Sequence, residues 1–266
     1  MNLSTYLQNL IAQWTRGTDF PAAPSSVQIG LSSTDPLVDG SGILEPLGAN
    51  GYSRQTVNFF PASSSVNFGS EIRNADPISF GPVTNATWSG VQYVFLVDDS
   101  DNLLMFGPMN TARSLPVGDT FVLAMNAVQL KLDLTFGRDF SFNILRWISG
   151  TAMPSAPTSL KLALSTTDPL SDLSAIDEPS TGDGYARQTM EFAAPTVVPG
   201  EGTVMEMAQP LIFGPAVINP WDQLTHGAIL DQDDNPIFFG ELASPRTVAI
   251  GDALPVATPT IKLLIR

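Results

Sequence analysis

The chain contains a single histidine, so any mechanism that uses an imidazole as general base must depend on His226. A Ser-His-Asp triad also needs an activated serine, and no Gly-x-Ser-x-Gly elbow occurs. Position 93, which an internal repeat described below makes equivalent, is Tyr93. A catalytic base is not expected to alternate with tyrosine, so we interpret His226 as a strand residue. No paired carboxylates or Gly-rich phosphate loop stand out either, and the sequence predicts no catalytic residue and no cofactor.

Two acidic segments, 98–102 and 231–235, offer the hard oxygen ligands that calcium prefers. Each is about half the length of the twelve-residue EF-hand loop and lacks its glycine and its distal glutamate. Asp and Asn also favour tight turns, because their side chains bond to nearby backbone amides. The sequence therefore favours solvated hairpin turns. No metal site is predicted, and calcium binding stays a minor alternative.

Arg54 and Arg187 lie in matched Gly-Tyr-x-Arg-Gln-Thr segments, two positions after Tyr52 and Tyr185. A structural interpretation has each guanidinium reach a carboxylate or a loop carbonyl while its stem packs on the tyrosine. A ligand-binding interpretation uses the same fork for a carboxylate or a sugar hydroxyl. We favour the structural role, because both segments keep the arginine.

Trp88 and Trp221 precede the clearest predicted hairpin strand of their segments. Core packing is the usual role of tryptophan, whereas an exposed ring could stack on a sugar. The sequence does not separate these two roles.

These paired segments belong to a tandem repeat with a constant offset. The four tryptophans form two pairs, Trp14 with Trp147 and Trp88 with Trp221, and the positions in each pair differ by 133. Asp35-Pro36 recurs at the same offset as Asp168-Pro169. Solenoid repeats are only roughly 20–50 residues long. The sequence therefore predicts two whole domains, residues 1–133 and 134–266.

Each predicted domain opens with a helix. Apolar residues recur at three- and four-residue intervals over 3–14, Ser4 can cap the start, and Gly17 can supply a left-handed exit. The second helix covers 140–148, with Asp139 or Ser141 as its expected cap and Gly150 at its end.

Strands follow each helix. Alternation of apolar and polar residues predicts strands over 27–31 and 160–164, each ended by the Asp-Pro pair. Further strands are expected in the first half at 52–59, 78–80, 91–97, 103–106 and 121–132. The predicted fold class is all-β, with two tandem jelly-roll or β-sandwich domains, each preceded by a short amphipathic helix.

Composition excludes several functions. The net charge is −14 with only 12 basic residues, so binding to nucleic acid is not expected. There is no cysteine, hence no disulfide framework and no thiolate metal site. No apolar run approaches the roughly 20 residues that span a bilayer, and no secretory signal is recognised, so no membrane partner is expected.

The ordered motifs resemble a family of small bacteriophage virion structural proteins. The resemblance is carried by Thr34-Asp-Pro36, Gly51-Tyr-Ser-Arg-Gln55, Ile78-Ser-Phe80, Trp88-Ser-Gly-Val91 and Gly118-Asp119, and by their copies in the second half. This chain departs from the family by having two copies, and by Trp221-Asp-Gln-Leu where glycine and valine are expected.

The resemblance implies a non-enzymatic virion protein, assembled in the host cytoplasm. Our principal hypothesis is a capsid decoration (cement) protein, because a fused pair with two equivalent faces can bridge two subunits of a shell. The implied partners are other virion proteins, above all the major capsid protein, with self-association as a further option. The alternatives are a tail-fibre adhesin that binds host glycans through exposed tryptophans and, less favoured, a polysaccharide depolymerase.

Overall fold

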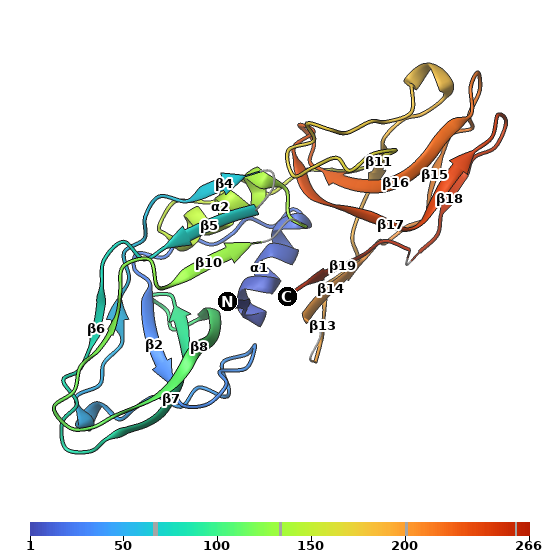
Figure 1. Ribbon diagram of the computed structural model, residues 1–266. Coiled ribbons are helices and arrows are strands. Elements are labelled where there is room, and N and C mark those ends of the chain that lie inside the picture. Colours follow the sequence, from blue (N-terminus) through green and yellow to red (C-terminus); the bar gives the residue numbers. More distant parts are fainter. Residues whose placement is uncertain (66–68, 133–134, 200–201, 259) are drawn as a thin grey trace.

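A computed structural model describes residues 1–65, 69–132, 135–199, 202–258 and 260–266. The chain is mostly β, and its two similar halves each begin with a helix that antiparallel sheets follow. Figure 1 shows the halves at opposite ends of an elongated molecule, with both helices in the middle. The all-β prediction is confirmed. The predicted boundary between residues 133 and 134 lies outside the described residues and stays a proposal.

Over its described residues the first half contains one helix, one 3-10 turn and three sheets. Its elements are β1 (Asn2–Leu3), α1 (Thr5–Thr15), β2 (Gln28–Ser32), η1 (Gly48–Asn50), β3 (Gln55–Thr56), β4 (Ser63–Ser65), β5 (Gly69–Arg73), β6 (Ile78–Phe80), β7 (Trp88–Val97), β8 (Leu103–Leu115), β9 (Phe121–Leu123) and β10 (Gln129–Leu132). The sheets have the orders β1-β8-β7-β2-β3, β10-β5-β4 and β6-β9.

The second half repeats this plan. Its elements are α2 (Arg138–Ile148), β11 (Leu160–Ser165), η2 (Thr181–Asp183), β12 (Gln188–Met190), β13 (Thr196–Val198), β14 (Gly202–Glu206), β15 (Leu211–Phe213), β16 (Trp221–Leu230), β17 (Pro236–Val248), β18 (Leu254–Val256) and β19 (Lys262–Ile265). The sheets have the orders β12-β11-β16-β17, β13-β14-β19 and β15-β18.

Two predicted strands differ from the structure. The segment 52–59 forms only the two-residue β3 and an isolated bridge from Phe59 to Asn74. The segment 121–132 divides into β9 and β10 around a turn in which Asn126 has φ 66°. Asn74 fixes this turn by donating to the Ala124 carbonyl at 2.9 Å and accepting the Val128 N–H at 2.8 Å.

The helix caps agree with the sequence in the first half and differ in the second. Ser4 caps α1 and accepts the Leu7 N–H at 3.1 Å, and Gly17 takes φ 90° after the helix. Helix α2 starts after Gly137, so the prediction of Asp139 or Ser141 as its cap is wrong. Gly137 is required by space, since a Cβ there would lie 1.8 Å from the Pro236 carbonyl oxygen.

Each helix packs against a sheet of the other half. Helix α1 contacts β14 in the second half, and α2 contacts β4 and β5 in the first. Two buried polar contacts fix this arrangement at equivalent positions: Thr203 Oγ1 donates to Gln8 Oε1 at 3.0 Å, and the hydroxyls of Ser70 and Ser141 lie 2.7 Å apart. The halves are therefore interlocked by a reciprocal exchange of helices.

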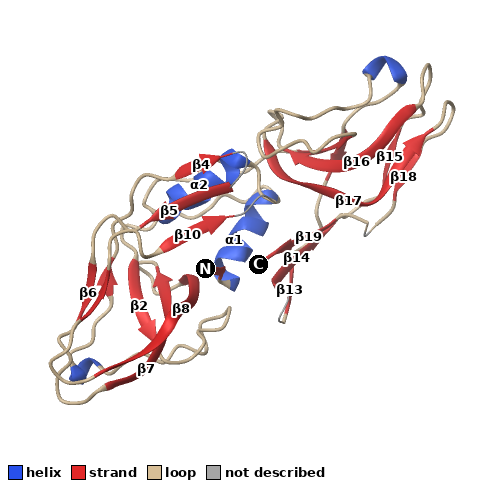
Figure 2. Cartoon of the chain, in the orientation of Figure 1, coloured by secondary structure: helices blue, strands red, loops and turns tan. Residues whose placement is uncertain are grey.

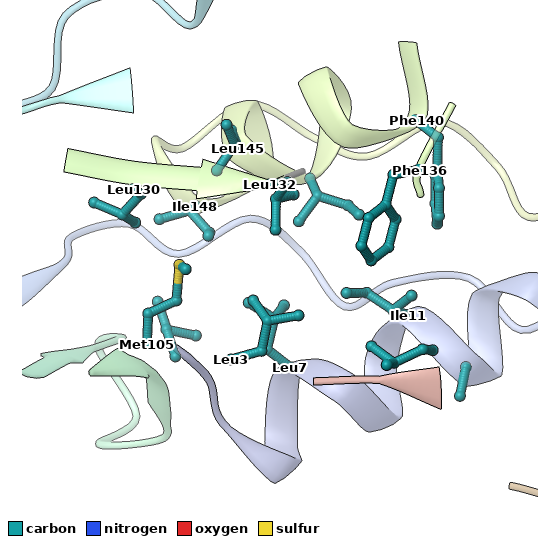
Figure 3. Packing of buried hydrophobic residues seen from close by; sticks show 14 of the residues in the cluster. Leu3, Leu7, Ile11, Met105, Leu130, Leu132, Phe136, Phe140, Leu145 and Ile148 are labelled. Atoms are coloured by element: carbon teal, nitrogen blue, oxygen red, sulfur yellow. The ribbon is translucent and has the colours of Figure 1, made fainter. Parts of the chain in front are cut away.

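The tryptophans that end the helices complete the exchange. Trp14 donates its indole N–H to the Pro154 carbonyl at 3.0 Å, and Trp147 donates to the equivalent Pro21 carbonyl at 3.0 Å. Trp14 also stacks on Phe140 of α2, with ring centroids 4.6 Å apart. Figure 3 shows apolar side chains of the two helices facing one another, together with Leu130 and Leu132 of β10, in one continuous core.

This arrangement bears on the capsid decoration hypothesis. The apolar helical faces are not available to dock on a capsid shell, because Leu7, Ile11 and Ile144 are fully buried between the halves. Burial of an apolar helical face inside the molecule removes it from any external partner. A surface for virion partners must therefore lie elsewhere.

Candidate functional site

The matched tyrosine and arginine form one network with a glutamate that the sequence analysis missed. Tyr52 donates to Glu45 Oε1 at 2.6 Å and accepts the Leu31 N–H at 2.8 Å. Arg54 binds the same carboxylate, with Nε 3.1 Å from both oxygens and Nη2 2.9 Å from Oε2, and also pairs with Asp101. Burial and the hydrogen bond to Glu45 raise the pKa of the Tyr52 phenol.

The second half repeats the network at every position. Tyr185 donates to Glu178 Oε1 at 2.7 Å and accepts the Leu164 N–H at 2.8 Å. Arg187 Nη2 lies 2.6 Å from Glu178 Oε2, and its Nη1 lies 2.9 Å from Asp234. Each network ties a loop to a hairpin turn: the loop after β2 to the turn between β7 and β8 in the first half, and the loop after β11 to the turn between β16 and β17 in the second.

The geometry favours a structural role for these arginines. The glutamate occupies the fork of each guanidinium, and the Arg54 guanidinium also lies over the Phe95 ring, 5.2 Å from its centroid. Bidentate arginine–carboxylate pairs are among the stronger polar contacts in proteins. Each guanidinium group is thus bound by a glutamate of the same chain and is not presented to a ligand.

Trp88 and Trp221 are core residues. Each is 2% exposed, and their indole N–H groups donate to the carbonyls of Asn50 and Asp183, both at 3.0 Å. Each ring meets the tyrosine of its own network edge-on, with centroids 5.4 and 5.5 Å apart. The glycan hypothesis expected exposed tryptophans, and that expectation is wrong because both rings are needed to fill the core.

The Asp-Pro pairs form turns. Asp35 accepts the Leu37 N–H at 3.0 Å, and Asp168 accepts the Leu170 N–H at 3.0 Å. Both leucines take a left-handed backbone conformation, with φ 60° at Leu37 and 61° at Leu170. Pro36 and Pro169 follow the aspartates directly and end the preceding strand. These residues set the path of the chain at the end of each strand.

The carboxylates of the acidic turns are engaged by donors of the protein. Asp98 accepts the N–H groups of Ser100 and Asn102 at 2.9 and 2.8 Å, and Asp231 makes the same bonds in its copy. Lys161 and Arg187 both pair with Asp234. The pKa of the Asp234 carboxyl is lowered, and the largest cause is the hydrogen bond from Lys161. Among the described residues, no group of three or more His, Asp or Glu side chains is placed to hold a metal ion.

His226 lies on β16, opposite Glu241 in the ladder, with Nδ1 2.9 Å from the Thr225 hydroxyl. The acidic turns join the arginine networks through Asp101 and Asp234, whereas the hydrogen bond of the His226 ring is to Thr225. The structure does not gather the predicted residues into one reactive site.

The two far ends of the molecule carry surface features that the sequence analysis missed. Near η1 a shallow groove of about 300 Å³ is lined by two segments of the chain, 44–47 and 87–89, together with Ser33 and Asn50. We call this surface the groove tip. Leu44 and Leu47 are 57% and 67% exposed.

Near η2 the equivalent end carries a protruding aliphatic cluster, which we call the knob tip. Its members Val217, Ile218 and Ile250 are 51%, 67% and 58% exposed. The Val217 N–H donates to the Asp183 carbonyl at 3.1 Å, and a bridge joins Ala216 to Ile250, so these loops form one surface. Figure 2 shows the short η turns at opposite ends of the molecule.

Taken together, the interlocked β-rich halves, filled cores and internally paired polar groups are those of a structural protein. The chain matches the family of podophage GP4 fiber I protein gp80 over residues 2–131 and 140–263, and it belongs to that family. It is therefore a fibre protein of the phage virion, and it acts alongside other virion proteins. No curated protein matches the chain.

The family assignment corrects the principal hypothesis from the sequence. A fibre protein is a virion structural component, but the match favours the fibre over capsid decoration. Within the described part of the chain, no helix has the length and apolar character needed to cross a membrane.

Proposed function

We propose that this chain is a non-enzymatic structural segment of the phage tail fibre that works as one rigid link. The proposal is carried by the reciprocal helix exchange: α1 packs on the second half and α2 on the first. Pulling the halves apart would expose fully buried side chains such as Leu7 and Ile144 to water. A fibre transmits force along its length, and a link of this kind resists separation of its parts.

The polar networks support the same function. Each Tyr-Arg-Glu network fixes a long loop to the adjacent hairpin, which stiffens the ends of the molecule. No described catalytic arrangement competes with this structural role. Glycan binding through tryptophan has no support, because the rings of Trp88 and Trp221 are buried.

The position in the particle can be tested directly. Antibodies against the purified chain should label tail fibres in electron micrographs of intact particles. Label confined to the head shell would overturn the proposal and restore the decoration hypothesis. As a check on the absence of enzymatic activity, the chain should release no reducing sugars from host envelope material.

A further inference from the structure

The two helices meet the sheet of the opposite half in the same geometry. Strand β10 pairs with β5, with Leu132 opposite Ser70, and β19 pairs with β14, with Ile265 opposite Thr203. The two pairs are separated by the common offset of 133 positions. Each helix packs on the middle strand of its sheet, α2 on β5 and α1 on β14. One contact is therefore a copy of the other.

The two contacts differ in how the chain connects them. Strand β10 leads directly into α2, with five residues between Leu132 and Arg138. The equivalent strand β19 comes last along the chain and α1 comes first, so no peptide leads from one to the other. Figure 1 shows both marked chain ends in the middle of the molecule, near α1. In a linear chain only one of two such junctions can be continuous.

We propose that the contact of α1 with β14 and β19 is a latch that opens while the rest of the fold stays closed. The contact of α2 with β5 and β10 is held by the peptide chain itself, because a short connection makes it cheap in entropy to bring two surfaces together. The latch has no such connection. Its opening exposes Met205 and Ile265, which are buried in the closed state, so the open state is a minor one.

A side chain of α1 takes the place of the missing connection. Gln8 is 1% exposed, its Nε2 donates to the Leu3 carbonyl at 3.0 Å, and its Oε1 accepts from Thr203 Oγ1 at 3.0 Å. Because Thr203 lies opposite Ile265, this one amide links the first strand of the chain to the sheet of the last. The equivalent residue of α2 is Ser141, whose short hydroxyl bonds to β5 and to its own helix.

Arg16 repeats this difference at the other end of α1. Its Nε donates to the Phe192 carbonyl of the second half at 3.2 Å. The equivalent residue after α2 is Ser149, whose hydroxyl bonds to the carbonyls of Leu145 and Arg146 in its own helix. At both positions a long polar side chain reaches across the junction that the peptide leaves open, and a serine stands at the junction that the peptide closes. Gln8 and Arg16 are thus the clasp of the latch.

Amide hydrogen exchange of the full chain tests the latch. Protection factors in β14 and β19 should be lower by about tenfold or more than at the equivalent positions of β5 and β10. Gln8→Ser, which recreates the serine of α2, should lower protection in β14 and β19 by about a further tenfold and leave β5 and β10 unchanged. Equal protection of the two sheets in the wild type, or an equal loss in both sheets of the variant, would overturn the proposal, because the sheets would then open together.

A circular permutant is the matched control. It begins at residue 134, ends at residue 133 and joins Arg266 directly to Met1. The new connection from β19 to α1 then has the same five residues in number as the natural connection from β10 to α2. The peptide now closes the α1 junction and opens the α2 junction, so β5 and β10 should become the less protected strands.

Both adverse results of the permutant are decisive. If β14 and β19 remained the less protected strands, the asymmetry would come from the local sequence and the latch would be excluded. If the permutant failed to fold, the two junctions would not be equivalent, and the proposal would fall as well.

Discussion

Replacing Ile11 by alanine should weaken the second half of the chain as much as the first. Ile11 is fully buried on α1, and Figure 3 shows it facing Phe136 in the core between the halves. The change removes three carbons, which costs about 2.4 kcal/mol at ~0.8 kcal/mol per carbon. The cavity left behind brings the total to about 4 kcal/mol, within the range of 2–5 for such substitutions.

Hydrogen exchange of backbone amides in the native protein measures which strands lose stability. The amides of β14 pair with β19 in the second half, far from Ile11 in sequence. A loss of about 4 kcal/mol lowers protection by nearly three orders of magnitude, at 1.4 kcal/mol for each factor of ten. We expect this fall in β14 together with the sheets of the first half, because the helix belongs to both cores.

The internal repeat supplies the matched variant. Ile144 is the equivalent residue on α2 and is also fully buried. Ile144→Ala should lower protection in β5 and β10 of the first half as well as in its own half. If Ile11→Ala lowered protection only in β2 and β7 while β14 stayed at the wild-type level, the halves would be independent and the exchange argument would fail.

Four further predictions follow from local geometry. Gly137→Ala should abolish stable folding of the full chain in expression and thermal-melt assays, since its Cβ would lie 1.8 Å from the Pro236 carbonyl oxygen; a normal melt would contradict the structure. Tyr52→Phe should lower the free energy of unfolding by about 1–3 kcal/mol in urea titrations, because the buried Leu31 N–H loses its acceptor, and a loss under 0.5 kcal/mol would argue against the network. Burial raises the pKa of Tyr52 and Tyr185 in the folded chain, so the stability that they contribute is complete below about pH 10 and falls as the pH rises above it. The free energy of unfolding of the double phenylalanine variant should therefore decline less steeply than that of the wild type between about pH 9 and 11. Adding calcium or EDTA should leave the melting midpoint unchanged, since donors of the chain already engage the acidic turns, and a calcium-dependent rise would revive a metal site.

Features that depend on neighbours in sequence were the ones that sequence reasoning recovered. Ser4 was identified as a helix cap and Gly17 as a left-handed exit, because the types and spacing of residues decide such local geometry. The hairpin of β7 and β8 was placed correctly and proved longer than predicted. Division of 121–132 was missed because its cause, Asn74, lies some fifty residues earlier in the chain.

The arginine networks show the same limit of prediction from sequence. The repeat singled out Tyr52 and Arg54, yet their partner Glu45 was missed. Its copy Glu178 lies at the common offset, so comparison of every acidic residue between the halves could have found it. The groove and knob tips offered a different signal, a change of chemistry between equivalent positions, and they were missed because the comparison looked only for identity.

The amino-acid sequence by itself determined that this protein is one β-rich unit written twice, since periodicity, turn residues and a constant offset are properties of the chain. It could not decide which half each helix would complete. An apolar helical face can pack equally well on the sheet of its own half or on the equivalent sheet of the other half. Only the path of the chain in space selects between these two sheets. The tertiary structure decided that exchange. It also placed Trp88 and Trp221 inside the core, and it left aliphatic side chains such as Leu47 and Ile218 exposed at the two ends of the molecule.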